Sequence, residues 1–458
     1  MMRMRPSTVL QILRHMINPL LIRNLALVLA VAFTVVACSS AQKSKKLIKG
    51  VRTPVLGVEK VLSADPGAEN ISIQLPQPTT NSTWEQPGGN IRKVMGHLTL
   101  SDQPKKVWSR NVGIGDSKKH FLISPPVVAE NMIFTIDTRA RVKALSLEDG
   151  KVKWSVLVPG PRKKRKKLAY GGGVSYGDGR IYAVSGFGTV AAYNAKDGTE
   201  IWTRELATLL RGGPVLYRDH IYITTEDNQV VALKASDGSE LWINTGIVED
   251  SSKFGIAAPS AINDSLLVGY SSGEVKAVNV GTGYDDWQDV LTSGMRLSAI
   301  ASIMDIDASP VVEPGRVYVV SNGGHMVAYE LSTGTHRWDR EIASRNTPWL
   351  AGDYLFVVSI DSVVTCVRKE DGKIIWATQL QRYRKVKNKK GRVIWSGPIL
   401  ASDRLVLVSS TGYIASVSPY TGKLLSVDRL GKGSFLPPIV AQNNLILMNR
   451  DADIIVYR

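Results

Sequence analysis

Residues 126–154 read PVVAENMIFTIDTRARVKALSLEDGKVKW, and this stretch decides the fold. It holds three short runs with apolar alternation or β-branched residues, at 126–128, 132–135 and 142–145, and a fourth begins at 152–155. Such runs, separated by polar turns, are typical of β-strands. Asp149-Gly150 separates the third and fourth runs, where a two-residue hairpin needs a positive φ that glycine adopts at little cost. The stretch predicts one unit of four antiparallel strands.

The same unit recurs along the chain. Its mark is an Asp-Gly or Thr-Gly pair followed, four residues after the glycine, by a tryptophan. Successive tryptophans lie 38 to 51 residues apart, a spacing that suits the four-stranded blade of a β-propeller. We expect these tryptophans to pack between neighbouring blades rather than to stack on a ligand. The copies have their glycines at Gly150, Gly198, Gly238, Gly283, Gly334 and Gly372, and a degenerate copy at Gly422 has Ser426 in place of the tryptophan.

The two ends of this array lack complementary parts of one unit. Residues 105–112 contain Trp108 and resemble a fourth strand with no first three before it. Residues 434–458 hold three apolar runs, at 437–440, 445–448 and 454–457, and no tryptophan. Joined, the ends make one complete blade. We therefore predict an all-β, eight-bladed β-propeller of four-stranded blades, closed by an N-terminal strand that removes the exposed sheet edges.

The N-terminus has the layout of a lipoprotein signal. Four arginines and no acidic residue precede an apolar run that ends at Cys38, as in a secretory signal peptide. As a helix the run rises only about 20 Å, short of a hydrocarbon core of roughly 30 Å, so cleavage is favoured over a permanent membrane span. Val35-Val36-Ala37-Cys38 resembles a bacterial lipobox, which implies acylation of Cys38 and stable membrane attachment through several acyl chains.

These features predict three segments: a signal peptide at 1–37, the lipidated cysteine with a tether at 38–95, and the propeller at 96–458. An Asp after the lipidated cysteine resembles an inner-membrane retention signal, and Ser39 stands there instead. We therefore expect a lipid-anchored protein on the periplasmic face of the outer membrane. Cys366 is the one remaining cysteine, so no intramolecular disulfide is possible, and its apolar surroundings predict a small buried core residue rather than a reactive thiol.

The charge of the chain is concentrated in three places. Its formal net charge is +17, and the signal segment with two acid-free runs accounts for all of it. Both runs fall between repeats, so we expect loops that are either solvated insertions or contacts with anionic lipid, lipopolysaccharide or an acidic protein. An exported lipoprotein has no expected nucleic-acid partner. The residues of the two runs are Arg162, Lys163, Lys164, Arg165, Lys166, Lys167, Arg382, Arg384, Lys385, Lys387, Lys389, Lys390 and Arg392.

The Gly-x-x-x-Trp ending of each unit resembles the PQQ-like repeat, which leaves two classes of function open. Dehydrogenases with this repeat hold pyrroloquinoline quinone and Ca²⁺ and typically have a vicinal Cys-Cys disulfide, whereas this chain has no adjacent cysteines and no compact Glu/Asn/Asp set. The lipobox, tether, eight repeats and closing strand together resemble the BamB family of outer-membrane β-barrel assembly factors. That resemblance implies a non-enzymatic scaffold with no cofactor, no metal ion and no catalytic residue. A periplasmic propeller that binds some other partner is the alternative.

The resemblance also implies a contact surface for BamA, the integral barrel subunit of the assembly complex. In the family this surface is associated with a Leu-x-Leu-Arg segment and an Asp-x-Asp segment. Thr208-Leu209-Leu210-Arg211 matches the first except at Thr208, and Asp305-Ile306-Asp307 matches the second. We expect both to be connections on one face, with Leu210 as an exposed apolar contact. Arg211 would pair either with the partner or with Asp305 and Asp307. Nascent outer-membrane proteins are a further candidate partner.

Overall fold

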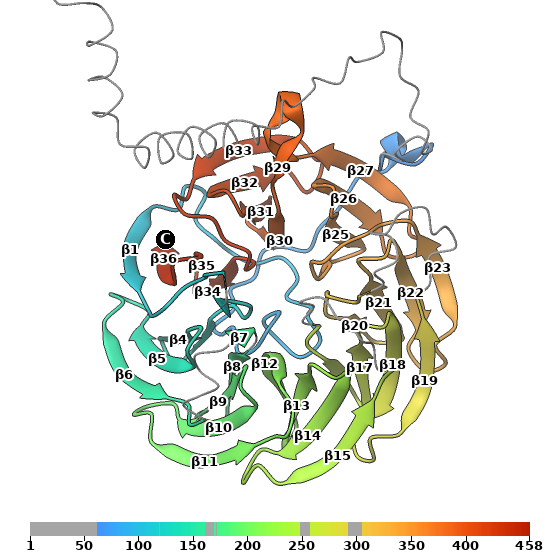
Figure 1. Ribbon diagram of the computed structural model, residues 1–458. Coiled ribbons are helices and arrows are strands. Elements are labelled where there is room, and N and C mark those ends of the chain that lie inside the picture. Colours follow the sequence, from blue (N-terminus) through green and yellow to red (C-terminus); the bar gives the residue numbers. More distant parts are fainter. Residues whose placement is uncertain (1–61, 119, 161–168, 171, 248–256, 292–304) are drawn as a thin grey trace, which may run out of the picture. The chain divides into compact units, whose positions relative to one another are not determined.

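The computed structural model describes residues 62–118, 120–160, 169–170, 172–247, 257–291 and 305–458. Eight four-stranded antiparallel sheets are arranged as blades around a ring (Figure 1), which confirms the predicted propeller. In chain order the first four blades are β3 to β6 (Val127–Ala129, Met132–Ile136, Arg141–Ser146, Val152–Leu157), β8 to β11 (Gly172–Gly177, Arg180–Ser185, Thr189–Asn194, Glu200–Glu205), β12 to β15 (Leu210–Tyr217, His220–Thr225, Gln229–Lys234, Glu240–Thr245) and β16 to β19 (Ser260–Ile262, Ser265–Gly269, Glu274–Asn279, Asp285–Val290).

The second half of the ring repeats this plan. Its blades are β20 to β23 (Val311–Glu313, Arg316–Val320, Met326–Glu330, His336–Arg340), β24 to β27 (Trp349–Ala351, Tyr354–Val358, Val363–Arg368, Ile374–Gln379), β30 to β33 (Trp395–Ala401, Arg404–Ser409, Tyr413–Val417, Leu424–Arg429) and the composite β34 to β36 with β1 (Ile439–Ala441, Asn444–Met448, Asp453–Tyr457, Lys106–Asn111). Outside the blades lie the pairs β2 (His120–Phe121) with β7 (Ala169–Tyr170) and β28 (Tyr383–Lys385) with β29 (Lys390–Arg392), and the 3₁₀ helices η1 (Ala68–Asn70) and η3 (Val386–Asn388).

The eighth blade closes the ring as the chain ends predict. Strand β1 pairs antiparallel with β36, so that Trp108 lies opposite Val456. The first strand of every blade is innermost and the fourth is outermost. Because strands alternate in direction, the chain passes from one blade to the next on one side of the propeller, which we call the connection face. The turns between third and fourth strands lie on the other side, which we call the turn face.

Seven tryptophans join neighbouring blades by one repeated contact. Each lies on an outermost strand, and its indole Nε1–H donates to a carbonyl in the third-to-fourth-strand turn of the next blade. Trp154, for example, donates to the Ala195 carbonyl at 2.8 Å, and its ring lies 2.8 Å from where a Cβ on Gly198 would stand. The other donors and acceptors are Trp108 and Leu147, Trp202 and Ala235, Trp242 and Val280, Trp287 and Leu331, Trp338 and Lys369, and Trp376 and Pro419.

The degenerate repeat marks the one junction where this contact has no counterpart. Ser426 on β33 faces the composite blade, whose third and fourth strands, β36 and β1, are not consecutive in the chain and so are not joined by a turn. There is no Asp-Gly turn for a tryptophan to cover. The loss of the tryptophan at position 426 therefore follows from the way the ring closes.

The turns themselves differ from the two-residue hairpin that the sequence predicted. The Ser146 N–H donates to the Lys151 carbonyl and the Gly150 N–H to the Ser146 carbonyl, so four residues form the loop. Gly150 alone among them has a positive φ, of 69°, as in the longer hairpin loops that place one residue in the left-handed region. Glycine is needed both for that φ and because the tryptophan ring leaves no room for a side chain.

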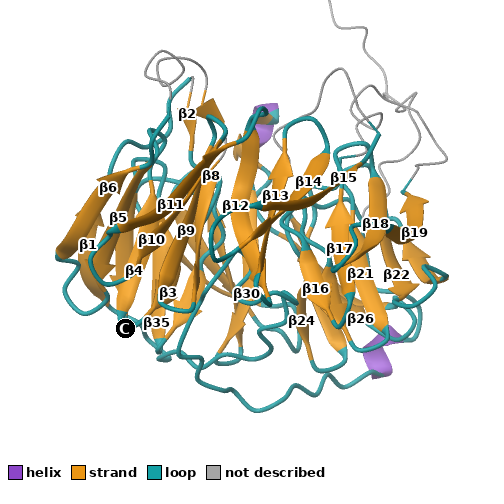
Figure 2. Ribbon diagram, turned by 90° about the horizontal axis from the view of Figure 1, so that it is seen from below, coloured by secondary structure: helices purple, strands orange, loops and turns teal. Residues whose placement is uncertain are grey.

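Residues 62–105, which we call the N-terminal arm, correct the predicted tether. We expected residues through 95 to lie outside the propeller, but the arm crosses the middle of the ring (Figure 1) on the turn face (Figure 2). It bonds to all eight blades in order round the ring. The pairs are Asn81 with Val440, Trp84 with Val128, Glu85 with Tyr176, Gln86 with Leu216, Ile91 with Ala261, Arg92 with Val312, Gly96 with Trp349, and Leu98 with Leu400.

The arm is part of the hydrophobic core. Trp84 is buried and stacks on Trp349, with ring centroids 6.3 Å apart. Together with Leu98 it belongs to the apolar cluster that spans the last three blades and reaches into the first. Cys366 is buried in the same cluster and free, as predicted, and burial raises the pKa of its thiol. Within the described ranges, no helix combines the length and the apolar character that a membrane span requires.

Candidate functional site

The two segments that resemble the family's contact motifs meet on the connection face. Arg211 of β12 and Ile306 of the connection before β20 line the same small cleft, about 30 Å³, between the third and fourth blades. Tyr270 also lines this cleft, and its carbonyl accepts a hydrogen bond from the Ile306 N–H at 3.2 Å. A side chain at Gly269 would collide with Ile306, so this glycine permits the close approach of the second segment to the end of β17.

The first segment differs from expectation in which leucine it exposes. Leu210 is fully buried and packs with Tyr182 and Ile223, so it is not the exposed apolar contact that we expected. It already belongs to β12 rather than to a loop, and in that strand its side chain points into the blade. Leu209, one residue earlier, is 40 % exposed. The alternation of side chains along an extended chain explains why one leucine is buried and its neighbour is not.

Arg211 is held in place at the rim of the cleft. Its side chain is only 12 % exposed, and its Nη2 lies 3.4 Å from the carboxylate of Glu226, which is about half exposed. The Thr224 hydroxyl donates to the Arg211 carbonyl at 3.2 Å. Glu226 also fixes Leu209, two residues before Arg211, because its N–H donates to the Leu209 carbonyl at 2.9 Å. Glu226 was not predicted, and nothing in its sequence context distinguishes it from other turn residues.

Hydrogen bonds and an ion pair hold the second segment, residues 305–307, in place. Asp305 is buried, and its carbonyl accepts from the Asn322 N–H at 2.9 Å. The Asp307 carboxylate, 5 % exposed, accepts from Arg345 Nε at 2.9 Å. Arg345 comes from the next connection, so it ties two neighbouring connections together. These contacts order the loop, and among the described residues around the cleft Leu209 and Glu226 are exposed beside the largely buried Arg211.

A second group of predicted residues forms a hairpin on the same face. The run from Arg382 to Arg392, expected as a loop, folds into β28, η3 and β29, with Tyr383 opposite Arg392. Figure 2 shows its short helix, in purple, on the same side of the propeller as β2. The predicted sharing of one face by this basic run and the cleft is thus observed. The run from Arg162 to Lys167 and the predicted lipidation site Cys38 lie outside the described residues.

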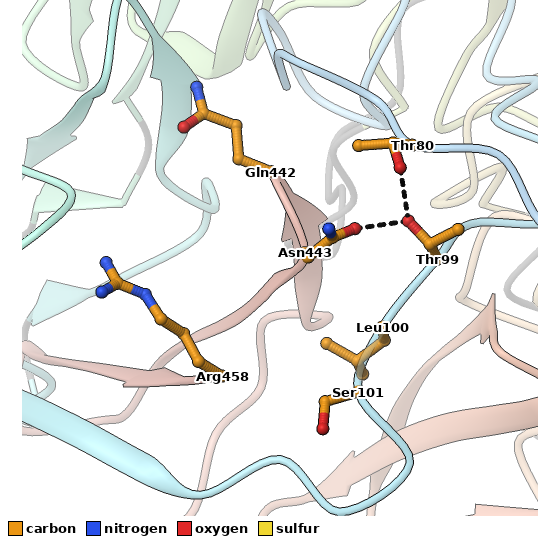
Figure 3. A pocket seen from close by; sticks show the side chains of 7 residues that line it. All are labelled: Thr80, Thr99, Leu100, Ser101, Gln442, Asn443 and Arg458. Atoms are coloured by element: carbon orange, nitrogen blue, oxygen red, sulfur yellow. Dashed lines mark hydrogen bonds between the residues drawn. The ribbon is translucent and has the colours of Figure 1, made fainter.

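A larger hollow, about 420 Å³, lies between the arm and the eighth blade (Figure 3). The Thr80 and Thr99 hydroxyls are 2.9 Å apart, and Thr99 also donates to Asn443. Its charged lining residue, Arg458, is engaged by the Leu147 carbonyl and Asn444. Hydroxyls and amides of this kind supply hydrogen bonds but no general acid or base. Among the described residues, moreover, no group of three or more His, Cys, Asp or Glu is placed to hold a metal ion.

Comparison with known sequences identifies one family. The sequence profile described as outer membrane protein assembly factor BamB matches residues 140–378. The BamB protein of Salmonella typhimurium is 29 % identical over 355 residues, which cover 77 % of this chain and 88 % of that protein. The BamB protein of Escherichia coli is 28 % identical over 371 residues, which cover 80 % and 92 %. The family profile alone spans more than half of the chain.

Comparison with solved structures supports the fold. The crystal structure of BamB from Moraxella catarrhalis superposes with a TM-score of 0.66 at 18 % identity, covering 78 % of this chain and all of that one. The quinohemoprotein alcohol dehydrogenase of Comamonas testosteroni superposes with a TM-score of 0.64 at 10 % identity, covering 82 % and 80 %. An assembly factor and an oxidoreductase superpose on this chain almost equally well. These superpositions are therefore evidence for the propeller fold alone.

Proposed function

The chain belongs to the family of the outer membrane protein assembly factor BamB, and on this premise we propose that it is a non-enzymatic scaffold lipoprotein of the β-barrel assembly machinery. In this role it helps outer-membrane proteins to insert and fold by docking to BamA. Acylated Cys38 would hold it on the periplasmic face of the outer membrane. Nascent outer-membrane proteins are its second proposed partner.

One observation carries the docking proposal: residues 208–212 and 305–307, distant in sequence, meet at one cleft on the face that the arm leaves free. Leu209 offers an exposed apolar contact at the rim, and Arg211 and Glu226 offer opposite charges beside it. Arginine is among the residues most enriched at binding hot spots, and neighbouring contacts such as Leu209 help to exclude water from it. Because Arg211 is already oriented by Glu226, little side-chain entropy remains to be lost when a partner carboxylate approaches.

The alternative of a quinone-dependent dehydrogenase is not favoured by family membership. The chain has no adjacent cysteines, whereas the enzymes with this repeat typically have such a pair beside the cofactor. The remaining alternative is a periplasmic propeller with some other partner. Such a protein should bind that partner and not BamA.

Co-purification tests the proposal. An affinity-tagged full-length chain would be extracted from its own membranes with a mild detergent, and BamA in the eluate would be quantified. We expect BamA with the unaltered chain, and at least a tenfold loss with the double variant Leu209→Ser/Arg211→Glu, because a charge reversal in a docked rim leaves like charges facing each other. The control is Lys196→Glu, which reverses a charge of the same sign at an exposed residue on the turn face and should retain BamA.

Two results would contradict the proposal. Absence of BamA from the eluate of the unaltered chain, with another protein recovered in stoichiometric amount, would support the alternative partner. Equal recovery of BamA by the unaltered chain and by the double variant would move the contact away from this cleft.

A further inference from the structure

The basic hairpin Tyr383–Arg392 is fixed at its base and extends from the connection face. Arg382, which precedes β28, and Arg392, the last residue of β29, both reach the same oxygen of Asp361 at 2.6 Å. Arg382 also lies over the Tyr383 ring, 5.6 Å from its centroid. Trp395 donates to the Gln381 carbonyl at 3.0 Å, which ties the hairpin to the seventh blade. The predicted basic run therefore divides into two clamped arginines and a projecting tip.

The tip carries five positive charges that no acidic side chain pairs with in the part of the chain that the structure describes. Its five cations, Arg384, Lys385, Lys387, Lys389 and Lys390, are all exposed. No acidic residue occurs between Asp371 and Asp403. Among the ion pairs of the described residues, none engages these five side chains.

The pairing of the hairpin places like charges against each other. Lys385 lies directly opposite Lys390, and directly opposed like charges destabilise a strand pair. Lys389 also has a φ of 47°, in the left-handed region that a non-glycine residue rarely adopts. An anionic surface outside the chain would reduce the repulsion between these lysines. In a hairpin that contacts only solvent, the repulsion would have no such compensation.

An apolar side chain stands at the centre of the charged tip. Val386 is 68 % exposed and begins the one-turn helix η3, with lysines on both sides of it in sequence. Exposed apolar residues surrounded by lysines are typical of segments that insert into the boundary of headgroups and acyl chains. Four of the five cations are lysines, which act as point charges, whereas arginine is favoured where a protein carboxylate is recognised in a fixed bidentate geometry.

We propose that this hairpin binds the surface of an anionic phospholipid bilayer, with Val386 entering the headgroup boundary and the five cations facing lipid phosphates. The site depends on charge density rather than on a pocket, which suits a fluid surface better than a folded acidic protein. It is independent of BamA docking, and the test below contains no partner protein, so the two proposals can fail separately.

Vesicle binding tests the proposal on the mature chain carrying Cys38→Ser, so that no acyl chain contributes. Vesicles of phosphatidylcholine with about one third phosphatidylglycerol should sediment the protein, and pure phosphatidylcholine should not. Each removed lysine is expected to weaken binding about fivefold. The quadruple variant Lys385→Gln/Lys387→Gln/Lys389→Gln/Lys390→Gln should therefore bind on the order of 600-fold more weakly. The control has the same charge change on exposed turn-face lysines: Lys151→Gln/Lys153→Gln/Lys196→Gln/Lys423→Gln.

A fluorescent probe separates insertion from simple attraction. An environment-sensitive dye attached to a V386C variant should shift to the blue with anionic vesicles, and Val386→Ser should weaken vesicle binding about threefold or more. Equal loss in the hairpin and control quadruples, or equal binding to neutral and anionic vesicles, would overturn the proposal. Binding to polyglutamate but not to vesicles would assign the hairpin to an acidic protein and would overturn it equally.

Discussion

The two faces of the propeller are built from the same blades but in different ways. On the turn face, seven junctions repeat one contact between a tryptophan and a glycine turn, and the N-terminal arm bonds to all eight blades. On the connection face, the links between blades vary from the short one before β12 to the hairpin of β28 and β29. The arm leaves this face free. The uniform face holds the ring together, and the variable face presents the cleft and the basic hairpin.

This difference predicts that substitutions on the two faces should affect different properties. Changes in the arm and in the turns should lower the free energy of unfolding, whereas changes at the exposed rim of the cleft should alter binding with little effect on stability.

The largest loss of stability is expected at the arm. Trp84→Ala would remove a buried ring that packs on Trp349, at a cost of about 3–5 kcal/mol. Denaturant unfolding monitored by circular dichroism measures this loss in the free energy of unfolding. Tyr284→Ala is the matched control, because Tyr284 is 78 % exposed and its loss should change stability by less than about 0.5 kcal/mol. Equal effects of the two substitutions would mean that the arm does not hold the blades together.

A buried lysine makes the contribution of the arm dependent on pH. Lys93 is buried, donates to the Asn90 carbonyl at 3.4 Å, and has a pKa lowered by burial from 10.5 to about 7. Between these values the unfolded chain binds the proton and the folded chain does not, so stability rises with pH. From pH 7 to 9.5 the expected rise is about 3 kcal/mol.

The variant Lys93→Met should abolish that rise, because methionine has no proton to exchange. Denaturant unfolding at several pH values compares the two chains. A slope that persists unchanged in the variant would assign the pH dependence to other groups.

The turns can be tested with a matched pair of glycines. Gly198 and Gly179 have φ values of 75° and 71°, but only a side chain at Gly198 would meet a ring, that of Trp154. Both substitutions to alanine cost about 1 kcal/mol for the left-handed backbone, and Gly198→Ala adds about 1–3 kcal/mol of overpacking. Thermal unfolding should therefore separate the two variants. Identical melting temperatures of the two variants would show that the Trp154 ring can make room for a methyl group at position 198 without loss of stability.

The sequence predicts the ring well because each blade repeats one local pattern. The turn glycines, the tryptophans and the complementary chain ends are local signals, and their number fixes eight blades. The arm was missed because it has no repeat and bonds mainly through its backbone, as at Trp84, Glu85, Ile91 and Arg92. Backbone hydrogen bonds to distant strands leave no pattern of side chains from which they could be predicted.

The candidate site was predicted only in part. Both motifs were predicted to lie in connections on one face, and the structure brings Arg211 and Ile306 together at one cleft. The choice between Leu209 and Leu210 depended on where β12 begins, and Leu210 already lies within that strand. The pairing of Arg211 with Glu226 depends on the approach of β12 and the turn after β13, which spacing alone does not specify.

Site-specific photocrosslinking in living cells tests the central claim most directly, namely that the connection face docks to BamA. A photoreactive residue at position 209 would be compared with one at position 196, which is exposed on the turn face. Both substitutions should leave stability within about 0.5 kcal/mol of the unaltered chain. We predict a crosslink to BamA from position 209 and none from position 196. Crosslinks from position 196 alone would contradict the assignment of function to the connection face.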